Sequence, residues 1–597
     1  MKGVKVKTGD WNLSLLYSGD ADEKIMKDVE AAGRTTKAFV KKWKETTGYL
    51  TDLSVLKTAL DEYEKLLSEY GLTGEAGYYW GLRESQDEDN PEIKAQINKL
   101  NEISVRRLNE LEFFELRIAK IKTSFQKKVL AAPLLMEYRH FLERLFQTAK
   151  FNLSEPEEKI VNIMEKTSHD NWVGMTSRFL AKEERTVIDE NGKKCKANLS
   201  RMLDLLNSPK KNVRDTAAVE VHEINEKYAD VAESEMNSIL ENKRNEDTLR
   251  SYSRPDEAQH ISGDIDSDVV DSMISAVSSN FKLCHRYYTL KAKLLGLPRL
   301  AYHERNVRYG NISRKYTFSE AMQVVRTSMR KLDRECVAIL DQFYTHGQYD
   351  VFPRKNKSGG AFCAHYLKGS PVYILLNFSG NYDEILTIAH ETGHGINDEL
   401  MRKSQNALNF HSPLSIAEVA STFFEDFALK ELLTGADEEM KRAVLMQKLN
   451  DDMSTIFRQI SAYRFEQELH EKFRKKGYVP KNEIGMIFQK HMSAYMGPAV
   501  SQDPGSENWW VYWSHFRRFF YVYSYASGLL ISKTLQAMVA KDSGSMVLVK
   551  RILSAGTSMS PKELFAEVGI DLTNKAFWVD GVAETGTLLT QIGSGMI

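Results

Sequence analysis

Residues 383–400 have the sequence DEILTIAHETGHGINDEL, and they follow the mostly apolar, β-rich run VYILLNF at residues 372–378. Apolar residues recur at helical spacing in the first segment, whereas the second has the composition of a short buried strand. The turn Ser379-Gly380-Asn381 separates the two segments. The sequence therefore predicts a small β-sheet next to a helix that carries several polar side chains.

Two histidines stand four residues apart in this predicted helix. His390 and His394 should project from one helix face about one turn apart, where their nitrogens can bind one Zn²⁺ at roughly 2.0–2.1 Å. Glu391 lies about 100° around the helix, where its carboxylate can take a proton from a water on the metal. Gly393 permits close approach of another backbone. A chance His-Glu-x-x-His is the alternative, expected in roughly a few per cent of sequences of this composition.

A third metal ligand is expected from residues 413–433, PLSIAEVASTFFEDFALKELL, which have the pattern of an amphipathic helix. Glu418 lies there among apolar residues, where a carboxylate is costly to bury unless a partner such as a metal compensates. Catalytic zinc commonly takes three protein ligands and a water. Glu425, seven residues on, is a candidate to accept the free N–H of a ligand histidine. For each glutamate, a surface carboxylate is the alternative interpretation.

Residues 510–530, WVYWSHFRRFFYVYSYASGLL, combine one histidine with four tyrosines. His515, Tyr521 and Tyr525 can donate hydrogen bonds to the oxyanion that forms when water adds to a peptide carbonyl. Considered alone, this composition favours an aromatic core helix. The metal motif earlier in the chain is what favours a catalytic role instead.

Most of the remaining chain has helical periodicity. Apolar residues recur at three- and four-residue spacing from residue 22 to about residue 145, and long helical stretches are expected at 212–243 and 267–295. Residues 186–197, TVIDENGKKCKA, predict a short hairpin. We place a domain boundary after this hairpin, near Ser200.

The predicted fold is therefore mainly α, with a small sheet beside the metal-binding helix. An N-terminal helical lobe is expected at residues 1–200 and a catalytic domain at residues 201–597.

Composition limits the classes of partner. With 81 basic and 82 acidic residues, the formal charge is −1, which gives no indication of a nucleic-acid or membrane-surface partner. Four scattered cysteines are too few for a disulfide scaffold and favour a reducing compartment. No apolar run of about 18 residues and no signal-peptide pattern occurs. We expect a cytoplasmic protein without a membrane span.

These elements, in this order, resemble the oligoendopeptidase F branch of the thimet-oligopeptidase-like zinc peptidases. The most specific similarity lies in residues 359–394, from GGAFCAHYL to HETGH, and in residues 412–426, SPLSIAEVASTFFED. The similarity covers nearly the whole chain. It continues in WNLSLLY at 11–17, LLNSPKKNVRDTAAVEV at 205–221, HFRRFFYVYSYASG at 515–528 and GIDLTNKAFW at 569–578.

The resemblance implies that His390, His394 and Glu418 hold one zinc ion and that Glu391 is the general base. The expected function is zinc-dependent hydrolysis of internal bonds in short, unstructured oligopeptides. Two alternatives remain open: a helical zinc carboxypeptidase that releases C-terminal residues, and a catalytically silent peptide-binding protein.

The resemblance also implies an elongated, two-lobed helical body with a deep substrate channel. In that channel, His515 and Tyr521, with Tyr525 as a further candidate, would contact the substrate or its oxyanion. The strand at residues 372–377 would pair with the extended peptide through backbone hydrogen bonds.

The sequence departs from the family pattern at a few positions. Asn397 stands where many relatives carry another histidine. Arg517 and Arg518 lie inside the His/Tyr segment, and two cations there predict a preference for an acidic group or a peptide C-terminus. Cys363 and His365 flank the predicted substrate strand, and we interpret them as plain strand residues because no partner at ligand spacing accompanies them.

Overall fold

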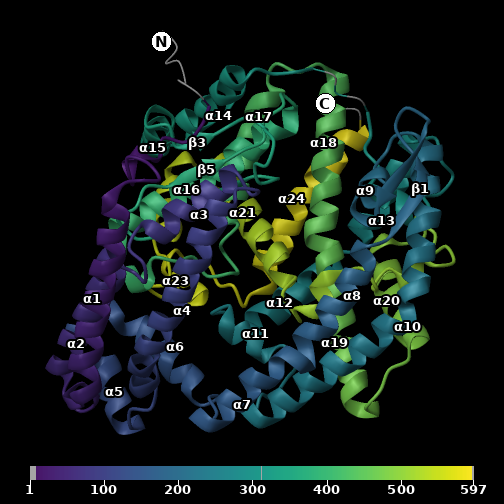
Figure 1. Cartoon of the computed structure of the whole chain (residues 1–597). Helices are drawn as coiled ribbons and strands as arrows, with labels where there is room; N and C mark the ends of the chain where they lie inside the picture. Colours follow the sequence, from purple (N-terminus) through teal and green to yellow (C-terminus); the bar gives the residue numbers. More distant parts are fainter. Residues whose placement is uncertain (1–8, 311, 313, 595–597) are drawn as a thin grey trace. The chain divides into compact units, whose positions relative to one another are not determined.

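The computed structural model describes the whole chain except residues 1–8, 311, 313 and 595–597. About 70% of the chain is helical, and the described residues form one two-stranded and one three-stranded sheet (Figure 1). The predicted mainly α class is confirmed. Among the described helices, none is long and apolar enough to cross a membrane.

The described residues form two compact units, each built from three separate stretches of chain. The first unit comprises residues 1–150, 313–435 and 535–569, and the second comprises residues 151–312, 436–534 and 570–597. The boundary expected near Ser200 lies inside the second unit, in helix α9 (Leu199–Leu205). The division into domains at that residue stays a prediction.

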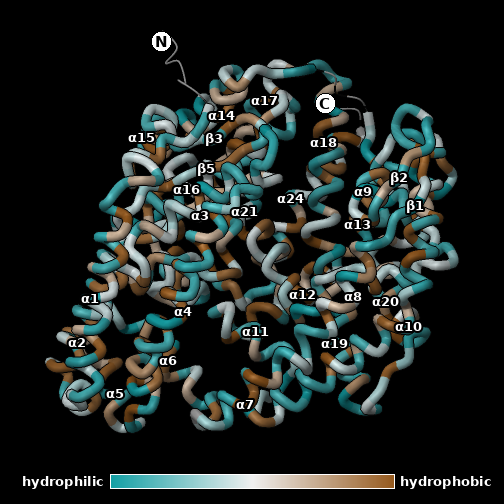
Figure 2. The backbone as a smooth tube through the Cα atoms, viewed as in Figure 1, coloured by the Kyte–Doolittle hydropathy of each residue, from teal (hydrophilic) through white to brown (hydrophobic). Residues whose placement is uncertain are grey.

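Amphipathic helices build most of the first unit, and Figure 2 shows hydrophilic and hydrophobic residues alternating along them. The rings of Phe39, Tyr63 and Phe114 contact one another in the core between α1, α2 and α4. The helices of this unit are α1 (Glu23–Glu45), α2 (Leu53–Glu69), α3 (Ala76–Gln86), α4 (Pro91–Ala119), α5 (Thr123–Ala131), α6 (Arg139–Ala149), α14 (Phe318–Leu332), α15 (Arg334–Thr345), α16 (Tyr382–Ser404), α17 (Val419–Leu433), α22 (Met546–Leu553) and α23 (Pro561–Glu567).

The three-stranded sheet also belongs to the first unit. Its strands β3 (Tyr349–Asp350), β4 (Phe362–Ala364) and β5 (Tyr373–Leu375) lie in the order β3-β5-β4. The central strand β5 pairs parallel to β3 and antiparallel to β4, and its three residues are fully buried. A capping box closes the N-terminus of α16, because the Glu384 carboxylate accepts the backbone N–H of Asn381. The strand and helix predicted from residues 372–400 are both present.

The second unit has a predicted hairpin and one helix break that we did not predict. Strands β1 (Glu184–Ile188) and β2 (Lys194–Asn198) pair antiparallel around Gly192, which has a φ of 78°. The stretch at residues 267–295 is two helices, because α12 ends at Ser279 with Asn280 as its C-cap. The helices are α7 (Glu155–Glu165), α8 (Asn171–Ala181), α9 (Leu199–Leu205), α10 (Lys211–Arg250), α11 (Glu257–Ser262), α12 (Ser267–Ser279), α13 (Lys282–Leu294), α18 (Glu438–Asp452), α19 (Gln459–Lys476), α20 (Lys481–Met496) and α24 (Lys575–Ser594); α21 (Tyr523–Lys541) contains the boundary at residues 534 and 535.

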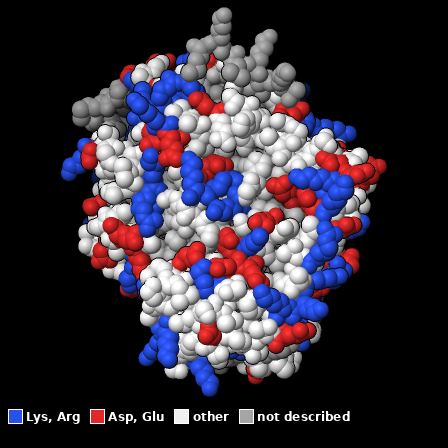
Figure 3. Space-filling view, turned by 90° about the vertical axis from the view of Figure 1, so that its left-hand side faces the viewer, with Lys and Arg blue, Asp and Glu red and all other residues white. Residues whose placement is uncertain are grey.

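Acidic and basic side chains are intermixed over the face of the molecule that Figure 3 presents. This distribution fits the formal charge of −1, and no extended surface of a single sign is seen on the described part of that face.

Candidate metal centre

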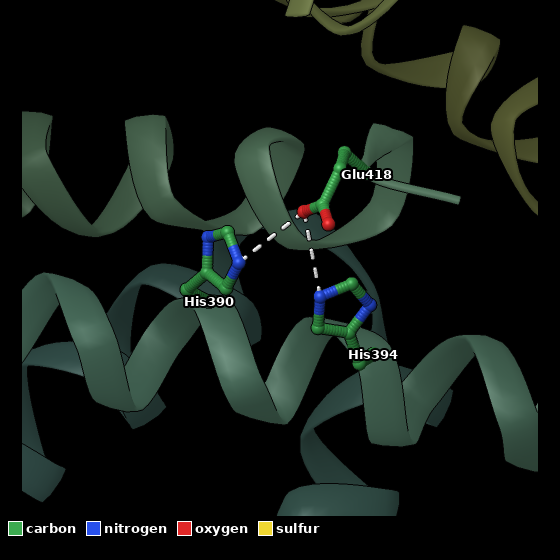
Figure 4. A group of neighbouring side chains, drawn as sticks. All are labelled: His390, His394 and Glu418. Carbon is green, nitrogen blue, oxygen red and sulfur yellow. Dashed lines mark ion pairs between the residues drawn. The ribbon is translucent and has the colours of Figure 1, made fainter. Parts of the chain in front are cut away.

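Two neighbouring helices of the first unit bring three candidate metal ligands together. His390 and His394 project from one face of α16, and Glu418 is the residue that precedes α17 (Figure 4). Glu418 Oε2 lies 3.3 Å from His390 Nε2 and 3.5 Å from His394 Nε2. Bonds of 2.0–2.1 Å at tetrahedral angles would place neighbouring ligand atoms about 3.4 Å apart. The two nitrogens and the oxygen therefore have the chemistry and the spacing that a zinc ion requires.

The close packing of α16 on α17 depends on Gly393. A Cβ atom at this position would lie 2.8 Å from Ser421 Cα and 2.9 Å from the carbonyl oxygen of Ala420. Such contacts are too short for carbon, so any larger residue would push the two helices apart. The Ser421 hydroxyl donates a 2.9 Å hydrogen bond to Glu418 Oε2, which fixes the carboxylate above the histidines.

Glu425 lies behind the ligand pair. Its Oε2 is 3.1 Å from His390 Nδ1, so that nitrogen donates to the carboxylate and leaves Nε2 facing the site. Burial alone would lower the pKa of His390, but Glu418 and Glu425 together raise it to about 10. The same histidines hold the pKa of Glu418 well below its usual value, although burial opposes this. The cluster therefore favours a positive charge at its centre, which a divalent cation would supply.

Glu391, the candidate general base, is buried beside the candidate ligands. Its side chain is 8% exposed, and burial raises the pKa of its carboxyl above the usual value while His390 and His394 oppose the shift. The backbone N–H of Cys363 hydrogen-bonds to the same carboxylate. A cavity of about 460 Å³ connects Glu391 with the three candidate ligands.

The strand expected to bind peptide by its backbone is not the one that has a free edge. Residues 372–377 contain β5, which is hydrogen-bonded on one side to β3 and on the other to β4. The prediction that this strand pairs with substrate is wrong, because its backbone groups are already used. The edge strand next to Glu391 is β4, and any strand addition at the cavity would use it.

The three aromatic and histidine candidates lie in the second unit and contact one another. His515 Nε2 is 3.1 Å from the Tyr525 hydroxyl, and the rings of Tyr521 and Tyr525 are 5.5 Å apart. The Trp513 indole donates to His515 Nδ1 at 3.1 Å, so the neutral imidazole carries its proton on Nε2. Burial lowers the pKa of His515, and Arg458 and Arg518 add to this effect. His515 is therefore a neutral hydrogen-bond donor.

The backbone of this segment is irregular rather than helical. Ser514–Arg517 form a single 3₁₀ turn, and α21 begins only at Tyr523. Phe519 and Phe520 have φ values of 34° and 59°, which are strained for aromatic residues. The aromatic core helix that the composition favoured is therefore wrong for residues 510–522.

Arg517 does not offer its charge to a substrate. Its side chain is 4% exposed, forms an ion pair of 2.8 Å with Glu235, and donates to the carbonyls of Trp510 and Trp513. The prediction of two available cations is wrong for this residue, because all of its donors are directed into the fold. Arg518 is exposed.

Three further groups line the metal cavity: His365, which we interpreted as a plain strand residue, and Asp398 and His411, which sequence reasoning missed. Asp398 follows His394 by four residues on α16, so the helical spacing that marked the candidate ligands would also have marked Asp398. His365 directly follows β4 and His411 lies in the loop before α17, and no local pattern marks either as a cavity residue.

Comparisons with known proteins support the same chemistry. A family model described as "Peptidase family M3" matches residues 204–584, and one described as "Oligopeptidase F" matches residues 118–178. The plasmid-encoded oligoendopeptidase F of Lactococcus lactis subsp. cremoris is 24% identical over 94% of this chain and 93% of its own length. The oligopeptidase PepF of Bacillus subtilis is 24% identical over 96% of this chain and 85% of its own length.

Solved structures show the same fold. A protein from Chlamydophila abortus described as a peptidase superposes with a TM-score of 0.85 at 21% identity, over 98% of each chain. Oligoendopeptidase-F from Enterococcus faecium superposes with a TM-score of 0.68 at 19% identity, over 96% of this chain and 99% of its own.

Proposed function

This chain belongs to peptidase family M3, and we propose that its own residues carry out zinc-dependent cleavage inside oligopeptides. It is an oligoendopeptidase of the F type, a metallopeptidase that hydrolyses internal bonds of oligopeptides. Peptidases of this family are zinc enzymes. We propose in addition which side chains hold the metal, which transfer protons and which bind the substrate.

We assign His390, His394 and Glu418 as the ligands of one zinc ion per chain. The observation that supports this most strongly is the separation of 3.3 and 3.5 Å between Glu418 Oε2 and the two Nε2 atoms, which matches tetrahedral coordination. When bound, zinc polarises the scissile carbonyl and lowers the pKa of water. Glu425 orients His390 by accepting its Nδ1–H.

Glu391 is the general base in this mechanism. Its carboxylate takes a proton from the attacking water, and the resulting carboxylic acid passes that proton to the leaving amine. The raised pKa that follows from burial suits both steps, because the group must hold the proton between them. No covalent bond between enzyme and substrate forms.

Donors from the second unit stabilise the oxyanion in this proposal. The neutral His515 Nε2–H donates to the Tyr525 hydroxyl, the Tyr521 ring packs against both rings, and an oxyanion would replace the Tyr525 oxygen as the acceptor. Donors that are already oriented do not need to reorganise when charge develops, which is the main source of oxyanion stabilisation.

We further propose that the enzyme works in the cytoplasm on short peptides. All four cysteines in the chain are free, which suits a reducing compartment. We keep residues 201–597 as the catalytic domain, because the family model for the peptidase begins at residue 204.

The test incubates peptides of about five to twenty residues with the wild type and with Glu391→Gln, and identifies the products by mass spectrometry. We expect internal cuts by the wild type and essentially none by the variant, with one zinc per chain in both. Release of single C-terminal residues would instead identify a carboxypeptidase. Binding of peptides without cleavage by a zinc-loaded wild type would identify a peptide-binding protein.

A further inference from the structure

A second group of polar side chains lies in the same cavity as the candidate zinc ligands. Cys363 and His365 come from the edge strand β4 and the residue after it, Asp398 from α16, and His411 from the loop before α17. All belong to the first unit. None has a role in the mechanism described above.

His365 is oriented by Asp398. Asp398 Oδ2 lies 3.1 Å from His365 Nδ1, and Asp398 itself is 5% exposed. The imidazole packs edge-on against Phe410, with ring centroids 5.5 Å apart. Burial lowers the pKa of His365, but the hydrogen bond to Asp398 outweighs it and raises the pKa above the usual value. Nδ1 therefore donates to Asp398, and the protonated ring has a second donor at Nε2.

The Nε2 atom of His365 has no hydrogen-bond partner among the residues that the structure describes. The neighbouring groups do not compete for its role. Burial, and then the charge on His365, lower the pKa of His411, which leaves that ring neutral. Burial raises the pKa of the Cys363 thiol well above its usual value, so it is a weak donor to Asp398 rather than a nucleophile. His365 thus presents one oriented donor to the cavity.

A smaller cavity of about 250 Å³ adjoins the first, because Ala361 lines both. Its other walls include Leu376, Phe378 and Ile388, so it suits an apolar side chain. Along α16, Ile388 precedes the zinc ligands whereas Asp398 follows them. The smaller cavity therefore lies at the start of β4, whereas His365 and Asp398 line the part of the larger cavity at the far end of this strand.

We propose that His365 is a specificity residue, whose Nε2–H binds a carboxylate side chain of the peptide on the N-terminal side of the cleaved bond. Strand β4 runs from Ala361 toward His365, and an added strand pairs more stably in the antiparallel direction. The peptide then enters with its N-terminal part at His365 and its C-terminal part at the apolar cavity. A glutamate or aspartate would form a hydrogen bond in which both partners are charged, whereas glutamine or asparagine offers only a neutral acceptor.

This inference rests on the proposed function, and its test separates the two. One peptide with a mapped cleavage site is prepared with glutamate or glutamine at each of the three positions on either side of the cut. Wild type, His365→Gln and Asp398→Asn are compared by kcat/KM on each pair. His346→Gln is the matched control, since it makes the same change at an exposed position of the first unit.

At one position N-terminal to the cut, we expect the wild type to prefer glutamate over glutamine by roughly 10- to 100-fold, as for a hydrogen bond to a charged group. His365→Gln should bring this ratio close to one while changing kcat/KM for the glutamine peptide about twofold at most. Asp398→Asn should reduce the ratio as well, because His365 loses its orienting partner. His346→Gln should leave it unchanged.

The proposal is overturned if the wild type shows no preference, if the preference lies C-terminal to the cut, or if His365→Gln retains the ratio. Cleavage of the glutamine peptide by the wild type supports the proposed function in every one of these cases. If no peptide is cut, calorimetry with the Glu391→Gln protein compares the Kd values of the two peptides. A tighter Kd for the glutamate peptide, lost on adding His365→Gln, supports the specificity role, and equal Kd values refute it.

Discussion

The metal centre and the segment from Trp513 to Tyr525 have comparable parts in the proposed chemistry, but they are held in place in different ways. The proposed ligands on α16 are positioned by the regular geometry of a helix and by one glycine that lets α17 approach. The His/Tyr segment is irregular, and residues far away in the sequence hold it. Glu235 binds Arg517 across 282 residues, and Glu466 accepts the N–H of Phe520 across 54. Spacing in sequence therefore locates the first site and not the geometry of the second.

Removing the proposed third ligand should have the largest effect on zinc binding and activity. Glu418→Ala removes one of the three proposed ligands together with its negative charge. The two remaining imidazoles should hold zinc only weakly. We expect the bound zinc to fall from one per chain to nearly none and kcat/KM to fall by at least about 10⁴-fold.

Metal analysis after dialysis and cleavage assays on the same sample check this prediction. Glu431→Ala, an acidic residue near the end of α17, is the control and should keep its zinc. Full zinc occupancy in the Glu418→Ala protein would show that another residue is the third ligand.

Removing a tyrosine hydroxyl from the irregular His/Tyr segment should have the next largest effect, on kcat. Tyr521→Phe and Tyr525→Phe each remove one hydroxyl without changing the ring packing. If that hydroxyl contacts the oxyanion, kcat should fall by roughly 10²–10³-fold with KM and zinc content little changed. Tyr512→Phe, in the same segment, is the control. Unchanged kcat in both tyrosine variants would leave His515 as the donor and remove the tyrosines from the mechanism.

A smaller effect tests how the helical site is supported. Glu425→Gln removes the negative charge that orients His390, at a distance of 3.1 Å. We expect zinc affinity to fall by roughly 10- to 100-fold while saturating zinc restores most of the activity. Titration with a competing chelator gives the affinity, and assays across zinc concentrations give the rescue. Loss of activity that zinc does not restore would assign Glu425 a direct part in catalysis.

Much of the fold and of the helical site was predictable, for the same physical reason. Helical periodicity predicted α16 and the hairpin signal predicted β1 and β2, because both depend on neighbours in sequence. Strand order does not depend on neighbours in sequence. Residues 372–377 were therefore predicted to pair with substrate, although β4 already occupies that edge. The prediction that Arg517 faces substrate was wrong because its ion-pair partner, Glu235, lies far away in the sequence on α10, where no local pattern indicates the contact.

The His365–Asp398 pair combines one residue that local spacing could have identified with one that it could not. Asp398 continues the helical face of His394 and was predictable from spacing, whereas His365 reaches it from β4 through the sheet. This contact joins segments that lie far apart in the sequence, and only the packing of the strand on the helix brings the two side chains within 3.1 Å.

The smallest expected effect concerns stability and comes from Glu466, which accepts a hydrogen bond from the strained backbone at Phe520. Glu466 on α19 is 1% exposed; its Oε1 accepts the Phe520 N–H at 2.8 Å, and its Oε2 has no partner among the described residues. Burial raises the pKa of this carboxyl to about 8, with a contribution from Asp256. The folded protein thus holds a proton here that the unfolded chain releases near its ordinary pKa of about 4.3.

A carboxyl whose pKa is higher in the folded state stabilises the fold fully below the unfolded value, and this stabilisation is lost as the pH rises through the folded value. The free energy of unfolding should therefore fall between about pH 5 and pH 8. Glu466→Gln keeps an acceptor for the Phe520 N–H and cannot ionise, so its melting temperature should change less over this range. Glu466→Leu loses the acceptor and should be less stable at every pH, by about 1–3 kcal/mol. Thermal melts of the three proteins from pH 5 to pH 9 measure this, and parallel pH profiles for wild type and Glu466→Gln would show that Glu466 is ionised in the native protein. In that case the positive φ angles of Phe519 and Phe520 would be held by a charge, and the irregular segment would depend on its distant partner even more than the neutral hydrogen bond implies.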